Sequence, residues 1–256
     1  MKALRWFPLI AGALALALVA AANASTTKNS SHHATSSTPA HASAPAATPA
    51  SAAPAADEHL AAVRKDLEQS AHNLRQYHWK ETIVVSLKGE DKSTIVNSVA
   101  CNGTGKLVRT PEPVPANSQM NGVRGATPSA EKAELQAYEH SAVALMRSYI
   151  PADPARLRKE AGKMTTSTEG DHVRLIFRDY QKPGDQVTFE LNPSSNQLTS
   201  VSVNSYLASA KDVVNLSADM SSLADGTIYP SRIRVDTPAK NMGLTVTNGE
   251  FQKKTT

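Results

Sequence analysis

The stretch from Asp171 to Leu207 constrains the fold more than any other part of the sequence. Apolar residues alternate with polar or charged ones in three short runs, at 173–178, 187–191 and 199–204. Alternation with a period of two predicts β-strands that have one buried and one wetter face. The two breaks carry turn chemistry, Lys-Pro-Gly-Asp at 182–185 and Asn-Pro-Ser-Ser-Asn at 192–196. We therefore expect an antiparallel meander of three strands.

The N-terminus predicts export from the cytoplasm. Lys2 and Arg5 precede an apolar run that ends in Ala22-Asn23-Ala24, the small residues that a signal peptidase reads. Residues 1–24 are therefore predicted to be a cleaved signal peptide, and a retained membrane anchor is the alternative. We expect a periplasmic or secreted protein from an envelope of the Gram-negative type.

Residues 25–56 are almost entirely Ala, Ser, Thr and Pro, so they predict a disordered linker. His32, His33 and His41 lie in this linker, and a loose trio of histidines does not define a metal site. Residues 57–256 are expected to form a single domain.

Cysteine count and charge exclude two classes of protein. Cys101 is the only cysteine, so no intramolecular disulfide can form, and its place in an alternating run predicts a small buried side chain. The 27 basic residues include Lys2, Arg5 and Lys28, which leaves 24 against 23 acidic residues. This near-neutral balance, without a dense basic run, argues against a nucleic-acid partner.

Three helices are predicted in the body. The first covers residues 57–74, with Asp57 as the N-cap, and the second covers residues 131–150. Asp153-Pro154 opens a short third helix that Gly162 stops. The apolar stripe of the first helix is Leu60, Val63, Leu67, Ala71 and Leu74.

Six further strands are predicted outside the meander, at 80–88, 93–101, 106–110, 213–220, 227–236 and 244–251. Pro230 indicates a sheet edge or a bulge in its strand. About eight or nine strands and three helices favour an α+β fold, with one curved antiparallel sheet and the helices packed on one face.

The sequence contains no catalytic motif. A nucleophile elbow, a zinc-protease helix and an EF-hand loop are all missing, and no His, Cys or acidic cluster has metal-ligand spacing. Gly103 and Gly105 predict a hairpin turn rather than a phosphate loop. His72 and His140 are interpreted as surface residues. We therefore predict neither an enzyme nor a cofactor.

The apolar surface is more informative about function. The second helix follows a long loop at 111–128 and is a candidate lid over the inner face of the meander. An incomplete cover would leave a cavity for an acyl chain, whereas a filled core explains the same residues. The candidate cavity residues are Val173, Leu175, Phe177, Val187, Phe189, Leu135, Tyr138, Leu145 and Tyr149.

Several segments resemble a largely uncharacterised family of exported bacterial proteins. They are LRQYHWKE at 74–81, VSLKGE at 85–90, SYIPADPARL at 148–157, VRLIFRDYQKPGD at 173–185 and LADGTIYPSRIRVDTPAK at 223–240. In its order of elements the chain more distantly resembles the superfamily of the periplasmic lipoprotein carrier and its outer-membrane receptor. This resemblance implies a half-open β-barrel that is lined with apolar groups and capped by helices. The resemblance carries over no individual functional residue, and Arg124, in the loop before the second helix, is the nearest candidate for the carrier's arginine between lid and sheet.

The leading hypothesis is a monomeric, non-catalytic periplasmic protein that holds a lipid or a lipoprotein acyl chain between sheet and helices. The second hypothesis is a module with a filled core that binds an envelope protein. The third hypothesis is an unrecognised hydrolase, whose acidic or histidine residues would converge only in the fold.

Overall fold

The computed structural model describes residues 52–113 and 129–254, and all of them belong to one compact unit. The predicted signal peptide, residues 25–51 of the predicted linker, the three linker histidines and Arg124 lie outside the described residues.

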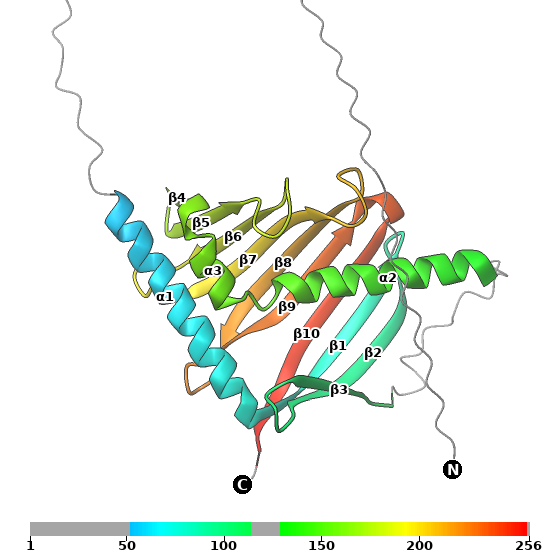
Figure 1. Cartoon of the computed structure of the whole chain (residues 1–256). Helices are drawn as coiled ribbons and strands as arrows, with labels where there is room; N and C mark the ends of the chain where they lie inside the picture. The colour runs from blue at the N-terminus through cyan, green and yellow to red at the C-terminus, as the bar shows by residue number, and fades with distance from the viewer. Residues whose placement is uncertain (1–51, 114–128, 255–256) are drawn as a thin grey trace, which may run out of the picture. The chain divides into compact units, whose positions relative to one another are not determined.

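Ten antiparallel strands form a single curved sheet with the helices on one face, which confirms the predicted α+β class (Figure 1). The strands are β1 (Tyr77–Leu87), β2 (Glu90–Cys101), β3 (Leu107–Pro111), β4 (Met164–Glu169), β5 (His172–Arg178), β6 (Gln186–Leu191), β7 (Leu198–Tyr206), β8 (Val213–Ser222), β9 (Ile228–Thr237) and β10 (Met242–Lys253).

The strand order joins the two ends of the domain. From β4 to β10 each strand lies beside the next in sequence, and β1 then pairs with β10 and carries β2 and β3 outward. In the part of the chain that the structure describes, the edge strands β3 and β4 are not paired with each other, so the sheet stays open. The half-open arrangement agrees with the predicted architecture.

The predicted meander is confirmed as β5, β6 and β7. Leu175 lies opposite Phe189, which lies opposite Val201, so the apolar sets of the three strands share one face. Pro230 lies opposite Met220 at a register shift between β9 and β8, so of the two predicted alternatives the bulge is confirmed, since β9 is not an edge strand.

The prediction of eight or nine strands was too low, because β4 was missed. Its sequence, Met-Thr-Thr-Ser-Thr-Glu, has no apolar alternation, and its side chains are exposed apart from half-buried Met164. Pairing with β5 makes this segment a strand, since every residue from Met164 to Glu169 has a partner there.

The helices are α1 (Ala52–Asn73), α2 (Ser129–Tyr149) and α3 (Pro154–Lys159). Asp57 lies inside α1, so its prediction as the N-cap was wrong. Alanine has the highest helix propensity, and proline is tolerated in a first turn, so the helix extends back through the Ala-rich segment around Pro54.

Two further details of the helices differ from the prediction. Ser70, not Ala71, occupies the buried stripe of α1. The Asp153 cap of α3 is confirmed by the bond it accepts from the Ala155 amide at 2.9 Å, but α3 ends at Lys159 and Gly162 lies in a separate 3₁₀ turn.

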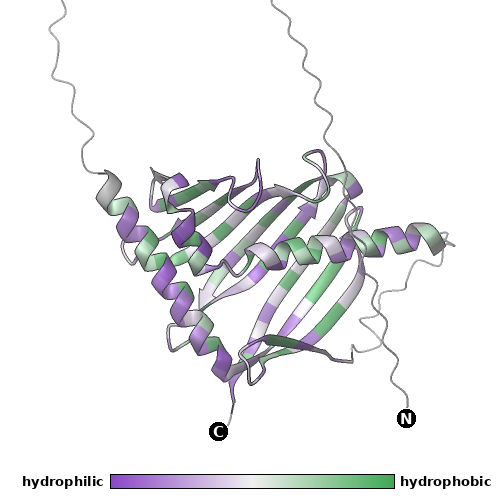
Figure 2. Ribbon diagram, viewed as in Figure 1, coloured by the Kyte–Doolittle hydropathy of each residue, from purple (hydrophilic) through white to green (hydrophobic). Residues whose placement is uncertain are grey.

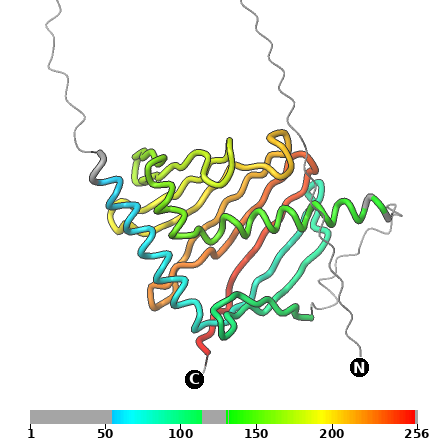
Figure 3. Tube along the Cα trace, viewed as in Figure 1, coloured from blue at the N-terminus to red at the C-terminus, as the bar shows by residue number. Residues whose placement is uncertain are grey.

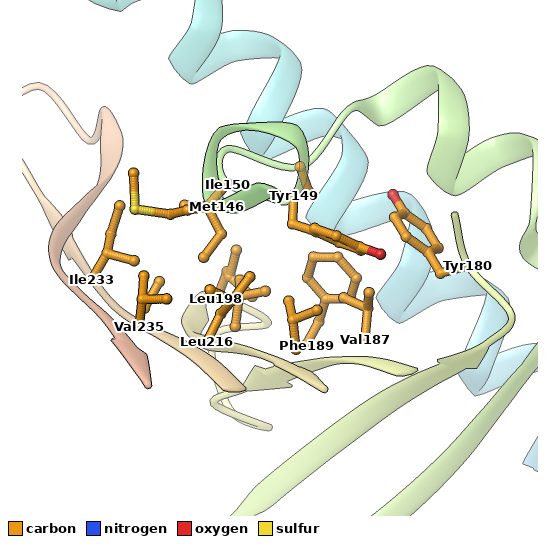
Figure 4. Packing of buried hydrophobic residues seen from close by; sticks show 14 of the residues in the cluster. Met146, Tyr149, Ile150, Tyr180, Val187, Phe189, Leu198, Leu216, Ile233 and Val235 are labelled. Carbon is orange, nitrogen blue, oxygen red and sulfur yellow. The ribbon is translucent and has the colours of Figure 1, made fainter. Parts of the chain in front are cut away.

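The main core lies between the sheet and the helices. Figure 2 shows apolar residues on the strands beneath α1 and α2, and the trace in Figure 3 shows both helices crossing the same face. In Figure 4, Met146 of α2 reaches toward Ile233, and the Tyr149 ring lies over Phe189. A second, smaller cluster of Tyr77, Trp79 and Val99 is separate from this core.

Candidate functional site

An apolar pocket lies where the two hydrophobic clusters leave the inner face of the sheet uncovered. Leu67 and Met146 on its wall belong to the main core, whereas Trp79 belongs to the smaller cluster. Its volume is about 120 Å³. We call it the inner pocket, and its lining comes from α1, β1, β3, the end of α2, the start of α3, β8, β9 and β10.

One wall of the inner pocket is aromatic. Trp79 stacks on Phe251 with ring centroids 5.3 Å apart, and Tyr229 lies 4.3 Å from Phe251. The Asn248 side chain fixes this wall, because its oxygen accepts from Trp79 Nε1 at 3.2 Å and its nitrogen donates to the Pro230 carbonyl at 2.8 Å. Rigid aromatic rings of this kind supply a large apolar contact surface.

Another part of the pocket lining carries an ionic cluster. Glu81 on β1 is buried, and it accepts from Arg109 Nε on β3 at 2.9 and 3.1 Å. Arg147 on α2 lies 3.7 Å from the same carboxylate, and Asn97 on β2 donates to it at 3.2 Å. Burial is the larger cause that lowers the pKa of Arg147, and repulsion from Arg109 is the smaller one. The attraction of Glu81 opposes this shift. Two guanidinium groups thus share one carboxylate.

The end of α1 closes the pocket through polar bonds to the turn between β8 and β9. Ser70 Oγ accepts from the Ile228 amide at 2.8 Å, and Asn73 Nδ2 donates to Thr227 at 3.1 Å. Just after α1, Tyr77 OH donates to Asp225 at 2.6 Å, and this bond holds the pKa of the Asp225 carboxyl well below its usual range.

The structure places the nine predicted cavity residues around the main core and not in the inner pocket. Val173, Leu175, Phe177, Val187 and Phe189 are buried and packed together. On α2, Tyr149 is buried as well, whereas Leu135, Tyr138 and Leu145 are partly buried against the same core. That these residues bind a ligand stays a prediction.

The residues that line the inner pocket were missed by the sequence reasoning. The first strand is predicted to begin at Lys80, but β1 begins at Tyr77 and so includes Trp79. Trp79 and Glu81 lie on the inner face, in phase with Ile83. Glu81 was the available signal in the sequence, because an acid in phase with the apolar residues of a strand indicates a buried charge. Arg147 gave no signal, because it is not among the residues of its helix that were predicted to line a cavity, Leu135, Tyr138, Leu145 and Tyr149.

The other residues that the sequence singled out do not converge on a site. His72 and His140 are exposed, as predicted, and Cys101 is half-buried rather than buried because it ends its strand beside a turn. Over residues 52–113 and 129–254, no three His, Cys, Asp or Glu side chains are placed to hold a metal ion. Within the same residues, no helix combines the length and apolar character needed to cross a membrane.

A second hollow, of about 500 Å³, lies at the turn between β5 and β6 and is open to solvent. It includes Asp185, but that carboxylate is engaged with Tyr149 OH and with the backbone amides of Tyr180, Gln181 and Lys182. We therefore assign no ligand to this hollow.

No protein-family model and no curated protein matches the sequence. Among solved structures, a LolA superfamily protein from Nitrosomonas europaea is similar at 11% identity and a TM-score of 0.40, over 75% of this chain and 94% of that chain. A DUF1329 family protein from Desulfovibrio piger is similar at 8% identity and a TM-score of 0.39, over 78% of this chain and 93% of that chain. An outer membrane lipoprotein-sorting protein domain from Vibrio parahaemolyticus is similar at 8% identity and a TM-score of 0.41, over 78% of this chain and 94% of that chain.

Solved structures that are named for the LolA superfamily and for lipoprotein sorting are thus among those that the chain resembles. At these identities and TM-scores the likeness carries nothing about the ligand of this chain. The closer resemblance to an uncharacterised exported family stays a prediction.

Proposed function

We propose that this protein is a non-catalytic binding protein of the cell envelope that holds the apolar part of a lipid or acylated ligand. The observation that carries the proposal is the inner pocket, an apolar hollow with a rigid aromatic wall in a gap between two packed clusters. The export signal predicted at residues 1–24 supports a periplasmic location.

The size of the inner pocket limits how a ligand would enter. Pockets for drug-sized ligands measure roughly 300–1,000 Å³, whereas this one measures about 120 Å³. It therefore accepts one end of an acyl chain as it stands. A whole chain requires α1 or α2 to move away from the sheet.

The first test combines lipid extraction with a titration. The protein, exported by its own signal and purified from the periplasm, would be extracted and analysed by mass spectrometry. The delipidated protein would then be titrated with a fatty acid while the emission of Trp79 is followed. We expect a co-purifying lipid and a saturable shift, because Trp79 lines the pocket. Trp79→Phe would remove the shift and assign it to this residue rather than to Trp6.

Two substitutions on α1 make the test specific to the pocket. Ala71 and Ala61 are both exposed, but only Ala71 lines the pocket. Ala71→Phe should fill the mouth and weaken binding, whereas Ala61→Phe should not. An empty extract and no response from the unmodified protein would refute lipid binding.

The filled main core favours a second candidate, an envelope module that binds another protein. Phe177, Phe189 and Leu175 are fully buried in the main core. Such a module would bind its partner at its outer surface or at a sheet edge. In that case Ala71→Phe would leave function intact, and crosslinking in the periplasm would capture a partner protein in place of a lipid.

A further inference from the structure

The ionic cluster gives the inner pocket an uncompensated positive charge. Arg109 and Arg147 both line the pocket, and Glu81 is the single carboxylate that they share. Glu81 is only 5% exposed, whereas the side chains of Arg109 and Arg147 are 26% and 39% exposed. The negative charge therefore lies beneath, and the two positive charges remain within reach of a ligand.

The two arginines are held with different strength. Arg109 donates to both oxygens of Glu81, so its guanidinium is tied to the sheet. Arg147 lies 3.7 Å from Glu81, beyond hydrogen-bond distance, and among the described residues its guanidinium makes no hydrogen bond. A guanidinium can donate in parallel to two oxygens of a carboxylate or a phosphate. Arg147 is thus placed to take an oxyanion beside the apolar wall.

We propose that the inner pocket selects amphiphiles with an anionic head group, which Arg147 binds with support from Arg109 while the chain lies against Trp79 and Phe251. The proposal rests on the proposed function, which leaves the ligand class open, and it names that class. A neutral head group would leave two half-buried positive charges with Glu81 as their single shared counter-charge, whereas an anionic head group supplies a second negative charge.

The proposal is tested with four probes on the delipidated protein: octanoate, octyl phosphate, octanol and inorganic phosphate. Binding would be measured by Trp79 emission and by calorimetry. We expect the two anionic amphiphiles to bind about tenfold tighter than octanol, the ratio expected for one hydrogen bond to a charged group. This preference should shrink as salt is added, because screening weakens charge interactions. Inorganic phosphate alone should not bind measurably.

Two pocket variants should shift the preference in opposite directions. Arg147→Gln should lower the affinity for octanoate to nearly that for octanol and leave the affinity for octanol unchanged. Glu81→Gln removes the competing carboxylate, so it should widen the preference for octanoate. General damage to the fold would instead weaken the binding of all amphiphiles in both variants. Arg158→Gln is the matched control, since Arg158 on α3 is 69% exposed and does not line the pocket.

Three results would overturn the proposal. Equal affinity of the unmodified protein for octanoate and octanol would leave lipid binding in place and refute the charge selection. Inorganic phosphate that binds as tightly as octyl phosphate would define a site for free anions. If no amphiphile binds, the proposed function and this inference both fail.

Discussion

At the scale of single residues, two buried carboxylates on the sheet side hold the end of α2. Glu81 attracts Arg147, and Asp185 accepts from the Tyr149 hydroxyl. Burial, followed by the bond to Asp185, raises the pKa of Tyr149, so the hydroxyl keeps its proton. A buried carboxylate that loses a donor carries a larger penalty than an exposed one.

We therefore expect Tyr149→Phe to lower the free energy of unfolding by about 1–3 kcal/mol, the cost of leaving one buried polar group short of a partner. Urea denaturation followed by circular dichroism measures the change. Tyr206→Phe is the control, because Tyr206 OH donates to the Pro183 carbonyl at an exposed position. Equal losses for the two variants would refute the role of the buried bond.

At the scale of secondary-structure elements, α1 packs on the domain through few buried side chains. Leu60, Val63 and Leu67 are its buried apolar side chains among the described residues, and the bond from the Ile228 amide to Ser70 adds one buried polar contact. Elements with few buried contacts open at lower free energy than the core. The opening of α1 would widen the inner pocket.

Ser70→Ala should therefore increase the hydrogen-exchange rate of α1 amides about fivefold or more, because the loss of a buried acceptor costs roughly 1 kcal/mol or more. Exchange in α2 should not change. Ser141→Ala is the control, since Ser141 on α2 is exposed and donates only to Ala137 of its own helix. A uniform increase across α1, α2 and the sheet would show that α1 does not open by itself.

At the scale of the whole molecule, three tyrosines between the helices and the sheet make stability depend on alkaline pH. Burial, followed by the bond to Asp212, raises the pKa of Tyr138 to about 12, and burial also raises the pKa of Tyr149 and Tyr180. The ordinary value is 10.0. Below that pH the phenols are neutral in both states, and above it the unfolded chain ionises first.

The urea midpoint should therefore stay constant as pH approaches 10 and fall between pH 10 and about 12. Tyr138→Phe should reduce this fall, because one of the three phenols no longer ionises in the unfolded chain. A midpoint that does not change across pH 10 would contradict the raised pKa values.

Local sequence determined the parts of the fold that local physics specifies. The alternation in β5, β6 and β7 set the buried face of each strand, and the turn residues between them set where each strand ends. Asp153 and Pro154 fixed the start of α3 in the same way, because a cap bonds to its own helix.

Tertiary structure decided the rest. β4 is a strand only because β5 pairs with it, and α1 buries Ser70 because the Ile228 amide lies there. The inner pocket exists because β1 pairs with β10, which brings Trp79 beside Phe251. Glu81, Arg109 and Arg147 meet for a similar reason, since they come from β1, β3 and α2. A charge cluster assembled from distant elements leaves no periodic pattern in the sequence, so only the packed chain reveals it.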